Sequence, residues 1–256
     1  MTNQVRIIHY GEQGFPGSAL YHMGRFGEVL NIPFYFWVVQ GGGRTVLIDT
    51  GVSPEQAKIE GENTVARFGK ECAWVVPPEK DPVKQLADIG IAPDDVDAII
   101  FTHLHGDHSA NLPAFPKSKL VMARKAWEAI TSPAHPDLIK PGFYPAYVME
   151  ELHRELGKRF RLVEDGEDVF PGIRCYRVGG HSPDLTVVTA ETSEGEVVFA
   201  SDAAVFYDSI ELGWPTSSFN MADSLYALDF IKGRGGIVLP GHDWDVLKRH
   251  PTGVIG

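Results

Sequence analysis

Residues 102–108 of this chain read Thr102-His103-Leu104-His105-Gly106-Asp107-His108. The stretch directly follows the apolar run 96–101, which is typical of a buried strand. Its side chains are therefore expected at the C-terminal end of a strand, where α/β proteins place their functional sites. His103, His105 and Asp107 alternate along the chain, so an extended or tightly turned backbone would point all three to one side. With His108 from the following turn, four potential metal ligands fall within six positions.

Three further candidate ligands follow other apolar, strand-like runs: His181, Asp202 and His242. Neutral imidazole and carboxylate are the ligands expected of Zn²⁺ and of some iron or manganese sites. One histidine alone would be better interpreted as a buried core residue, but so many ligand-type residues at strand ends favour a metal site. The candidates divide into a first group (His103, His105 and His181), a second group (Asp107, His108 and His242), and Asp202 as a bridge between them.

The composition limits the class of protein. Lys and Arg number 23 against 34 Asp and Glu, which gives a net charge of −11, and 43% of the 256 residues are hydrophobic. We expect one domain over residues 1–256 and no nucleic-acid partner, because phosphate binding needs basic patches. Cys72 and Cys175 lie in no Cys-x-x-Cys pair, so no redox motif is indicated. Without a signal segment or an apolar stretch near the ~20 residues of a membrane helix, we expect a cytoplasmic protein with no membrane contact.

Hydrophobic periodicity predicts strands and helices in both halves of the chain. Residues 11–31 are expected to form a loop that could wrap the site, and the polar residues 53–80 a mobile segment with short helices around 72–76. Because each half supplies strands, helices and ligands, we expect two sheets packed face to face with helices outside. The expected strands are 5–10, 33–39, 44–51, 96–101, 119–122, 161–163, 173–178, 185–189, 196–200 and 236–239, and the expected helices are 82–89, 124–130, 148–156 and 221–231.

Asp49 ends the second strand of a predicted hairpin and has two interpretations. It could cap the following loop, or it could accept a hydrogen bond that fixes a metal-bound histidine. The residue pattern by itself leaves both open.

The pattern His103-x-His105-x-Asp107-His108, with the three later ligands at strand ends, resembles the metallo-β-lactamase superfamily. The likeness extends over nearly the whole chain and includes the early segment Leu47-Ile48-Asp49-Thr50-Gly51. It implies an αββα sandwich, in the α/β (α+β) class, in which the two ligand groups each bind one metal and Asp202 bridges them.

Within the superfamily the chain is most similar to the N-acyl-homoserine lactonases. The segments that carry this likeness are Asn31-Ile32-Pro33, Ser182-Pro183 and Gly241-His242-Asp243. Two positions depart from that family's pattern. Asp184-Leu185 stands where the third-histidine motif usually continues as Gly-His, and Val205 stands where the family carries a tyrosine that aids the substrate carbonyl. Tyr207, two residues further on, is the candidate for that role.

The resemblance implies hydrolysis of a small cyclic ester at two zinc ions, with iron, manganese or cobalt as other candidate metals. A metal-bound hydroxide would attack the carbonyl, Asp107 would carry the proton to the leaving group, and Tyr207 could hydrogen-bond the oxyanion. The alternatives are a cyclic amide or thioester substrate, or a mononuclear iron dioxygenase acting on persulfides. The expected partner is a small-molecule substrate, such as an N-acyl-homoserine lactone, and the protein is expected to be a monomer or homodimer.

Overall fold

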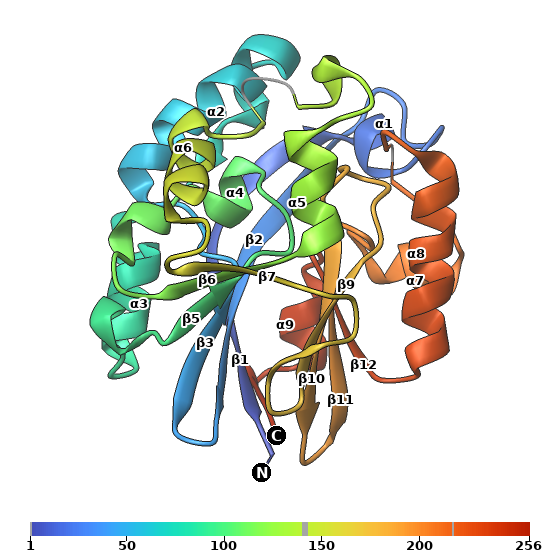
Figure 1. The fold of residues 1–256 in the computed structure, drawn as a ribbon. Coiled ribbons are helices and arrows are strands. Elements are labelled where there is room, and N and C mark those ends of the chain that lie inside the picture. The colour runs from blue at the N-terminus through green and yellow to red at the C-terminus, as the bar shows by residue number, and fades with distance from the viewer. Residues whose placement is uncertain (1, 140–142, 217) are drawn as a thin grey trace.

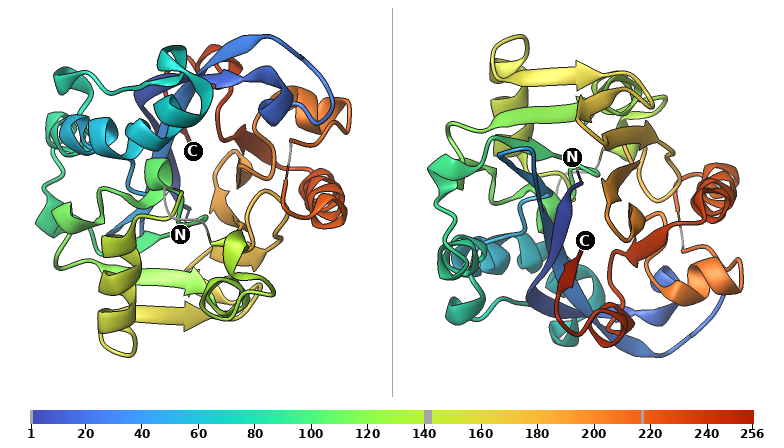
Figure 2. Two further views of the ribbon diagram at one scale, coloured as in Figure 1. Left: turned by 90° about the horizontal axis from the view of Figure 1, so that it is seen from above. Right: turned by 90° about the horizontal axis from the view of Figure 1, so that it is seen from below.

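The computed structural model describes residues 2–139, 143–216 and 218–256. In these residues two β-sheets pack face to face, and helices cover the outer face of each sheet (Figure 1). Seen from above in Figure 2, the cyan helix α2 (Pro54–Phe68) and the red helix α8 (Met221–Arg234) lie on opposite sides of the sheets. This is the four-layer αββα sandwich that the sequence predicts.

The first sheet is eight-stranded and mixed, in the order β13-β1-β2-β3-β5-β6-β7, with β4 paired to β1. Strands β3, β5, β6 and β7 are parallel, whereas β1, β2 and β3 form antiparallel pairs. The strands are β1 (Gln4–Pro16), β2 (Val29–Gly41), β3 (Arg44–Ile48), β4 (Trp74–Val75), β5 (Ala98–Ile100), β6 (Lys119–Ala123), β7 (Phe160–Val163) and β13 (Val254–Ile255).

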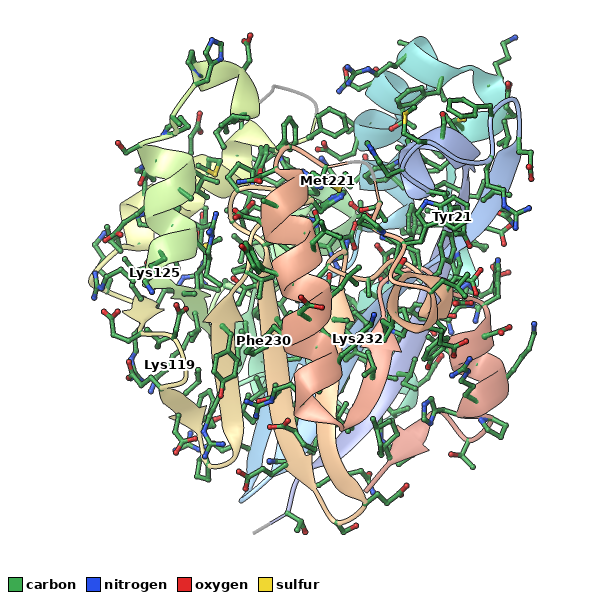
Figure 3. All side chains as sticks on the ribbon, turned by 90° about the vertical axis from the view of Figure 1, so that its right-hand side faces the viewer. Tyr21, Lys119, Lys125, Met221, Phe230 and Lys232 are labelled. Carbon is green, nitrogen blue, oxygen red and sulfur yellow. The ribbon has the colours of Figure 1, made fainter. Side chains whose placement is uncertain are left out.

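The second sheet is five-stranded, in the order β12-β11-β10-β9-β8, and only β11 and β12 pair in parallel. Helix α8 lies along its outer face, as the view from that side shows (Figure 3). The strands are β8 (Asp168–Phe170), β9 (Ile173–Arg177), β10 (Thr186–Thr192), β11 (Gly195–Ser201) and β12 (Ile237–Pro240).

In the middle of strand β2, residues 34–39 are apolar without interruption, because both faces of the strand are covered. Phe34 and Phe36 pack into the core between the first sheet and its helices, while Tyr35 and Trp37 pack into the core between the sheets. Because successive side chains point to opposite faces, a strand covered on both sides must be apolar at every position. The first sheet is therefore held by two separate cores.

The helices that pack on the first sheet are α2, α3 (Pro82–Asp88), α5 (Arg124–Thr131) and α6 (Ala146–Glu155). The others are α1 (Gly17–Leu20), α4 (Gly106–Ser109), α7 (Tyr207–Glu211) and α9 (Asp245–Arg249). Short 3₁₀ turns lie at Lys70–Cys72, Pro78–Lys80, Pro93–Asp95, Leu112–Ala114 and Pro136–Leu138. None of the helices in the described ranges is long and apolar enough to span a membrane.

The expected loop at 11–31 is wrong over much of its length. β1 and β2 stay paired far into it, with Gln13 opposite Ile32 and Pro16 opposite Val29. The glycines that suggested a loop serve close packing instead: a Cβ atom at Gly14 would lie 2.1 Å from the Glu71 carbonyl oxygen. Glycine inside a strand often marks such a close approach.

The expected mobile segment at 53–80 is also wrong, because α2 fills half of it. Ser53 caps this helix, its Oγ accepting from the Gln56 backbone N–H at 3.1 Å, and Pro54 occupies the first helical position. Both are standard helix-start signals. The polar composition belongs to the exposed face of the helix, which buries only four of its residues.

Candidate metal centre

The predicted ligands all lie at one edge of the sandwich, beyond the C-terminal ends of four strands. His103 follows β5, and the motif then turns into α4, which carries Asp107 and His108. His181 follows β9, Asp202 follows β11, and His242 follows β12. In Figure 1 this edge, marked by α4, is opposite the end that holds both chain termini.

The structure brings all seven predicted ligands together. Their ligating atoms form three overlapping groups, and within each group these atoms lie within 4.8 Å of one another. Two of the groups are the ones expected from the sequence. The groups are His103, His105 and His181; His103, His108 and Asp202; and Asp107, His108 and His242.

Asp202 lies between the two predicted groups. Its Oδ2 is 3.3 Å from His181 Nε2, and its Oδ1 is 3.2 Å from His242 Nε2 and 3.4 Å from His108 Nε2. One carboxylate oxygen therefore faces each side, which is the arrangement that a bridging ligand needs. A Cβ atom at Gly241, just after β12, would lie 2.7 Å from Asp202 Oδ1 and 2.9 Å from the Ser201 carbonyl carbon, so the close approach of these two segments favours glycine there.

The donor set fits divalent cations. The Nε2 atoms of His103 and His108 are buried and have no hydrogen-bond partner among the described residues. In the same ranges no Lys or Arg pairs with the buried carboxylates of Asp107 and Asp202. Buried carboxylates need pairing or a metal, and buried histidine nitrogens aimed at one point supply neutral ligands for it.

The histidines of the cluster differ in the direction in which their pKa values are shifted. Burial, reinforced by neighbouring imidazoles, lowers the pKa of His105 to about 3 and the pKa of His103 below its usual value. Burial alone would also lower the pKa of His108, but Asp107, Asp49 and Asp202 outweigh it and raise that pKa well above the usual value. Asp202 and Asp107 raise the pKa of His242 against the effect of burial. Without a cation, protons on His108 and His242 therefore offset the charge of the neighbouring carboxylates.

A narrow cavity of about 90 Å³ opens onto the cluster. His105, Asp107, His181, Asp202 and His242 form its polar end. Its remaining wall is mostly apolar and comes from β1, α1, β2, α2, β4, α4, and loop residues before α6 and on either side of α7. An adjoining hollow of about 250 Å³ shares part of this wall and adds Phe68 and Phe219.

Comparison with known proteins agrees with this site. The model of the Metallo-beta-lactamase superfamily matches residues 35–249. The chain belongs to the metallo-beta-lactamase superfamily. It is a lactonase-like, metal-dependent hydrolase.

Several of the similar proteins within the superfamily are lactonases. An N-acyl homoserine lactonase of Bacillus thuringiensis is 24% identical over 227 residues, which cover 87% of this chain and 86% of the relative. One from Bacillus cereus is 28% identical over 233 residues, with the same coverage. Among solved structures, an N-acyl homoserine lactone hydrolase with the product N-hexanoyl-L-homoserine at its metal centre superposes with a TM-score of 0.78. It is 23% identical to this chain, and the match covers 97% of this chain and 96% of the other.

Asp49 hydrogen-bonds to the candidate ligand His108 on the side of its ring away from the other ligands' carboxylates. Its Oδ2 accepts from His108 Nδ1 at 2.8 Å and from Thr102 Oγ1 at 2.7 Å, and its Oδ1 accepts from the Thr102 backbone N–H at 2.8 Å. Of the two interpretations, the structure favours the second, because Asp49 accepts a hydrogen bond from His108, a candidate ligand. Asp49 has a φ of +63° and Ser201, next to Asp202, a φ of +46°. Such strained backbone gathers at functional sites.

Asp49→Asn is expected to weaken metal binding by about 10–100-fold, the usual cost of losing a carboxylate behind a ligand histidine. The amide keeps the size of the side chain but removes the charge that holds the His108 ring and its tautomer. Competition with a metallochromic chelator measures the affinity. The matched control is Asp88→Asn on the exposed face of α3, which should leave metal affinity unchanged; equal affinities in the two variants would contradict the role of Asp49.

Asp184 is a buried residue at the site whose role the sequence analysis did not identify. Its Oδ2 accepts from the Leu104 backbone N–H at 2.8 Å, and its Oδ1 accepts from Tyr144 Oη at 2.8 Å. Leu104 lies between His103 and His105, so Asp184 fixes the backbone that spaces these two ligands. The departure from the Gly-His pattern of the lactonases was the available signal, because a carboxylate placed after a strand-end ligand needs a buried partner.

Tyr207 does not reach the centre, contrary to the sequence-based expectation. Its hydroxyl donates to the Val238 carbonyl oxygen at 3.1 Å, and its ring packs in the core between the sheets, with the Arg249 guanidinium 3.6 Å from the ring centroid. The residue starts α7, and that turn directs it away from the cavity. At the expected position of the family tyrosine, Val205 lines the cavity instead.

Proposed function

We propose that this protein is a dinuclear lactonase that opens small cyclic esters, with N-acyl-homoserine lactones as the first substrates to test. The observation that carries the proposal is the position of Asp202, whose two oxygens each face one histidine group at distances of 3.2–3.4 Å. A site for one metal would need only one of these groups. The lactonase relatives support the choice of ester.

The ligands of the two proposed metals follow from the groups. His103, His105 and His181 would hold one cation, Asp107, His108 and His242 the other, and Asp202 both. A pair of divalent cations would supply an activated water near neutral pH and polarise the substrate carbonyl. Zinc is the metal that we propose, because the donors are imidazole nitrogens and carboxylate oxygens.

Asp107 has the position for proton transfer. Its Oδ2 lies 3.3 Å from His108 Nε2 and 3.6 Å from His242 Nε2, and the side chain lines the cavity while remaining 12% exposed. Tyr10 donates from its hydroxyl to the Asp107 backbone carbonyl oxygen and so fixes the residue from behind. We propose that the Asp107 carboxylate takes the proton from the attacking water and gives it to the leaving alkoxide.

The walls of the cavity favour an uncharged substrate with an apolar part. Phe15, Phe68, Phe143 and Phe219 line the outer hollow, and no Lys or Arg lines either cavity within the described residues. A strongly anionic substrate would find no counter-charge from the protein there. A neutral lactone that carries an apolar chain can place its ring at the metals and its chain against these rings.

The test is a substrate screen of the zinc-loaded protein over lactones, cyclic amides and thioesters, run beside metal analysis. We expect two metals per chain, turnover of lactones, and a loss of at least ~100-fold in kcat for Asp107→Asn, the usual scale of general acid–base catalysis. One iron per chain with persulfide turnover would favour the dioxygenase alternative. Turnover of thioesters or cyclic amides alone would replace the proposed substrate, and an unimpaired Asp107→Asn variant would remove Asp107 from the mechanism.

A further inference from the structure

The cavity wall beside the metal ligands contains two polar side chains that the proposed mechanism does not use. Gln13 in β1 and Trp74 in β4 both line the cavity. They are direct partners across the antiparallel β1–β4 pair. Residues that face each other in this way lie on the same side of a sheet with their Cβ atoms about 5 Å apart. Gln13 and Trp74 therefore form one continuous piece of wall.

Each of these side chains holds a polar atom without a partner. Gln13 is 6% exposed, and its Oε1 is buried with no hydrogen-bond partner in the part of the chain that the structure describes. The same is true of the indole Nε1 of Trp74. An unsatisfied buried polar group is costly, and here two such groups belong to residues that face each other on the cavity wall. The Gln13 oxygen is an acceptor, and the Trp74 indole N–H is a donor.

The surroundings of Trp74 hold its ring at this wall. A Cβ atom at Gly106, inside the ligand motif, would lie 3.2 Å from the indole, and a Cβ atom at Gly61 in α2 would also lie 3.2 Å from it. The Phe34 ring packs edge-on against the indole with centroids 5.4 Å apart. Two glycines thus give the indole its space directly beside the metal ligands. The Gln13 amide, by contrast, can turn about its soft terminal torsion to meet a ligand.

We propose that Gln13 and Trp74 determine specificity by binding a secondary amide of the substrate. An amide offers what this wall lacks, since its carbonyl oxygen can accept from Trp74 Nε1 and its N–H can donate to Gln13 Oε1. A plain lactone offers nothing to the Gln13 acceptor, because an ester has no N–H. This inference rests on the proposed lactonase function, and it assigns to two named residues the discrimination between amide-bearing lactones and simple ones.

The kinetic test compares two substrates in four proteins, the original, two test variants and one control variant. N-hexanoyl-homoserine lactone carries the amide, and a γ-lactone with an alkyl chain of similar length does not. Trp74→Phe keeps an aromatic ring but removes the donor, and Gln13→Met keeps the length but removes the acceptor. In each variant we expect the ratio of kcat/KM for the amide substrate to that for the alkyl lactone to fall about 10-fold. Phe15→Leu, on the same strand and the same cavity wall, is the control that should change both substrates by similar factors.

A second measurement does not depend on turnover. The zinc-loaded protein has five tryptophans, and the Trp74→Phe variant identifies the Trp74 indole N–H signal in a ¹H–¹⁵N spectrum. N-hexanoyl-homoserine, the ring-opened acid, should shift this signal downfield, whereas a hydroxy acid without the amide should not. An unchanged kinetic ratio, or an indole signal that moves equally with both acids, overturns the proposal. If no lactone is hydrolysed, the proposed function fails, and the indole signal still decides whether this wall binds an amide.

Discussion

Asp202→Asn is expected to reduce the bound metal from the two ions that we propose to one or fewer per chain, and to lower kcat/KM for the best lactone by more than ~100-fold. A carboxylate behind a ligand costs about 10–100-fold when it is removed, and Asp202 contacts both histidine groups directly. The asparagine amide keeps the volume but has one oxygen in place of two and no charge. The substitution therefore removes the contact on one side and places an amide N–H against histidine nitrogens or a cation on that side.

Metal analysis after dialysis and steady-state kinetics measure the two effects on the same samples. Asp88→Asn is again the matched control, since it makes the same chemical change on a side chain that is 61% exposed and pairs with Lys84. A variant at Asp202 that still bound two metals and kept kcat/KM within ~10-fold of the original would show that Asp202 does not bridge. Loss of activity with both metals retained would place its role in the reaction and not in binding.

The convergence of the candidate ligands could be predicted from the sequence because they follow the ends of strands. An apolar run fixes where a strand stops, and the residue just beyond it lies at the sheet edge whatever the loops do. His181, Asp202 and His242 are far apart in the chain, yet β9, β11 and β12 deliver them to the same place. The layer arrangement could be predicted for the same reason, since strands that are apolar at every position need cover on both faces.

The errors came from residues whose role depends on a distant partner. Gly14 suggested a loop, but it is a glycine because the Glu71 carbonyl packs against it. Tyr207 is close to Asp202 in sequence, but the direction of a side chain at the start of a short helix is set by packing, and Val238 and Arg249 hold it in the core. Asp184 could be noticed but not explained, because its partners Leu104 and Tyr144 come from other parts of the chain.

Removing the metal is expected to lower the thermal midpoint of unfolding by about 10 °C. A ligand bound only by the folded state at ~1,000 times its Kd contributes ~4 kcal/mol, and for a chain of this size ~1 kcal/mol corresponds to roughly 2–4 °C. The physical origin is a group of little-exposed carboxylates whose charge a bound cation would neutralise. They are Asp107, Asp202 and Asp49, with side chains that are 12%, 7% and 0% exposed.

The size of this loss should depend on pH with a definite sign. In the metal-free protein the carboxylates raise the pKa values of His108 and His242, despite burial, above their usual value near 6.5. Groups with a raised folded-state pKa contribute stability below pH ~6.5, and this contribution is lost as the pH rises through the raised values. Protons therefore replace the cations best in acid, and removing the metal should lower the midpoint of unfolding more at pH 8 than at pH 6.

Thermal unfolding with and without chelator at both pH values measures this difference, with metal content checked in each sample. A midpoint that did not move after complete stripping would mean that the carboxylates are stable without a cation, and a larger loss at pH 6 would mean that the two histidines do not hold the compensating protons.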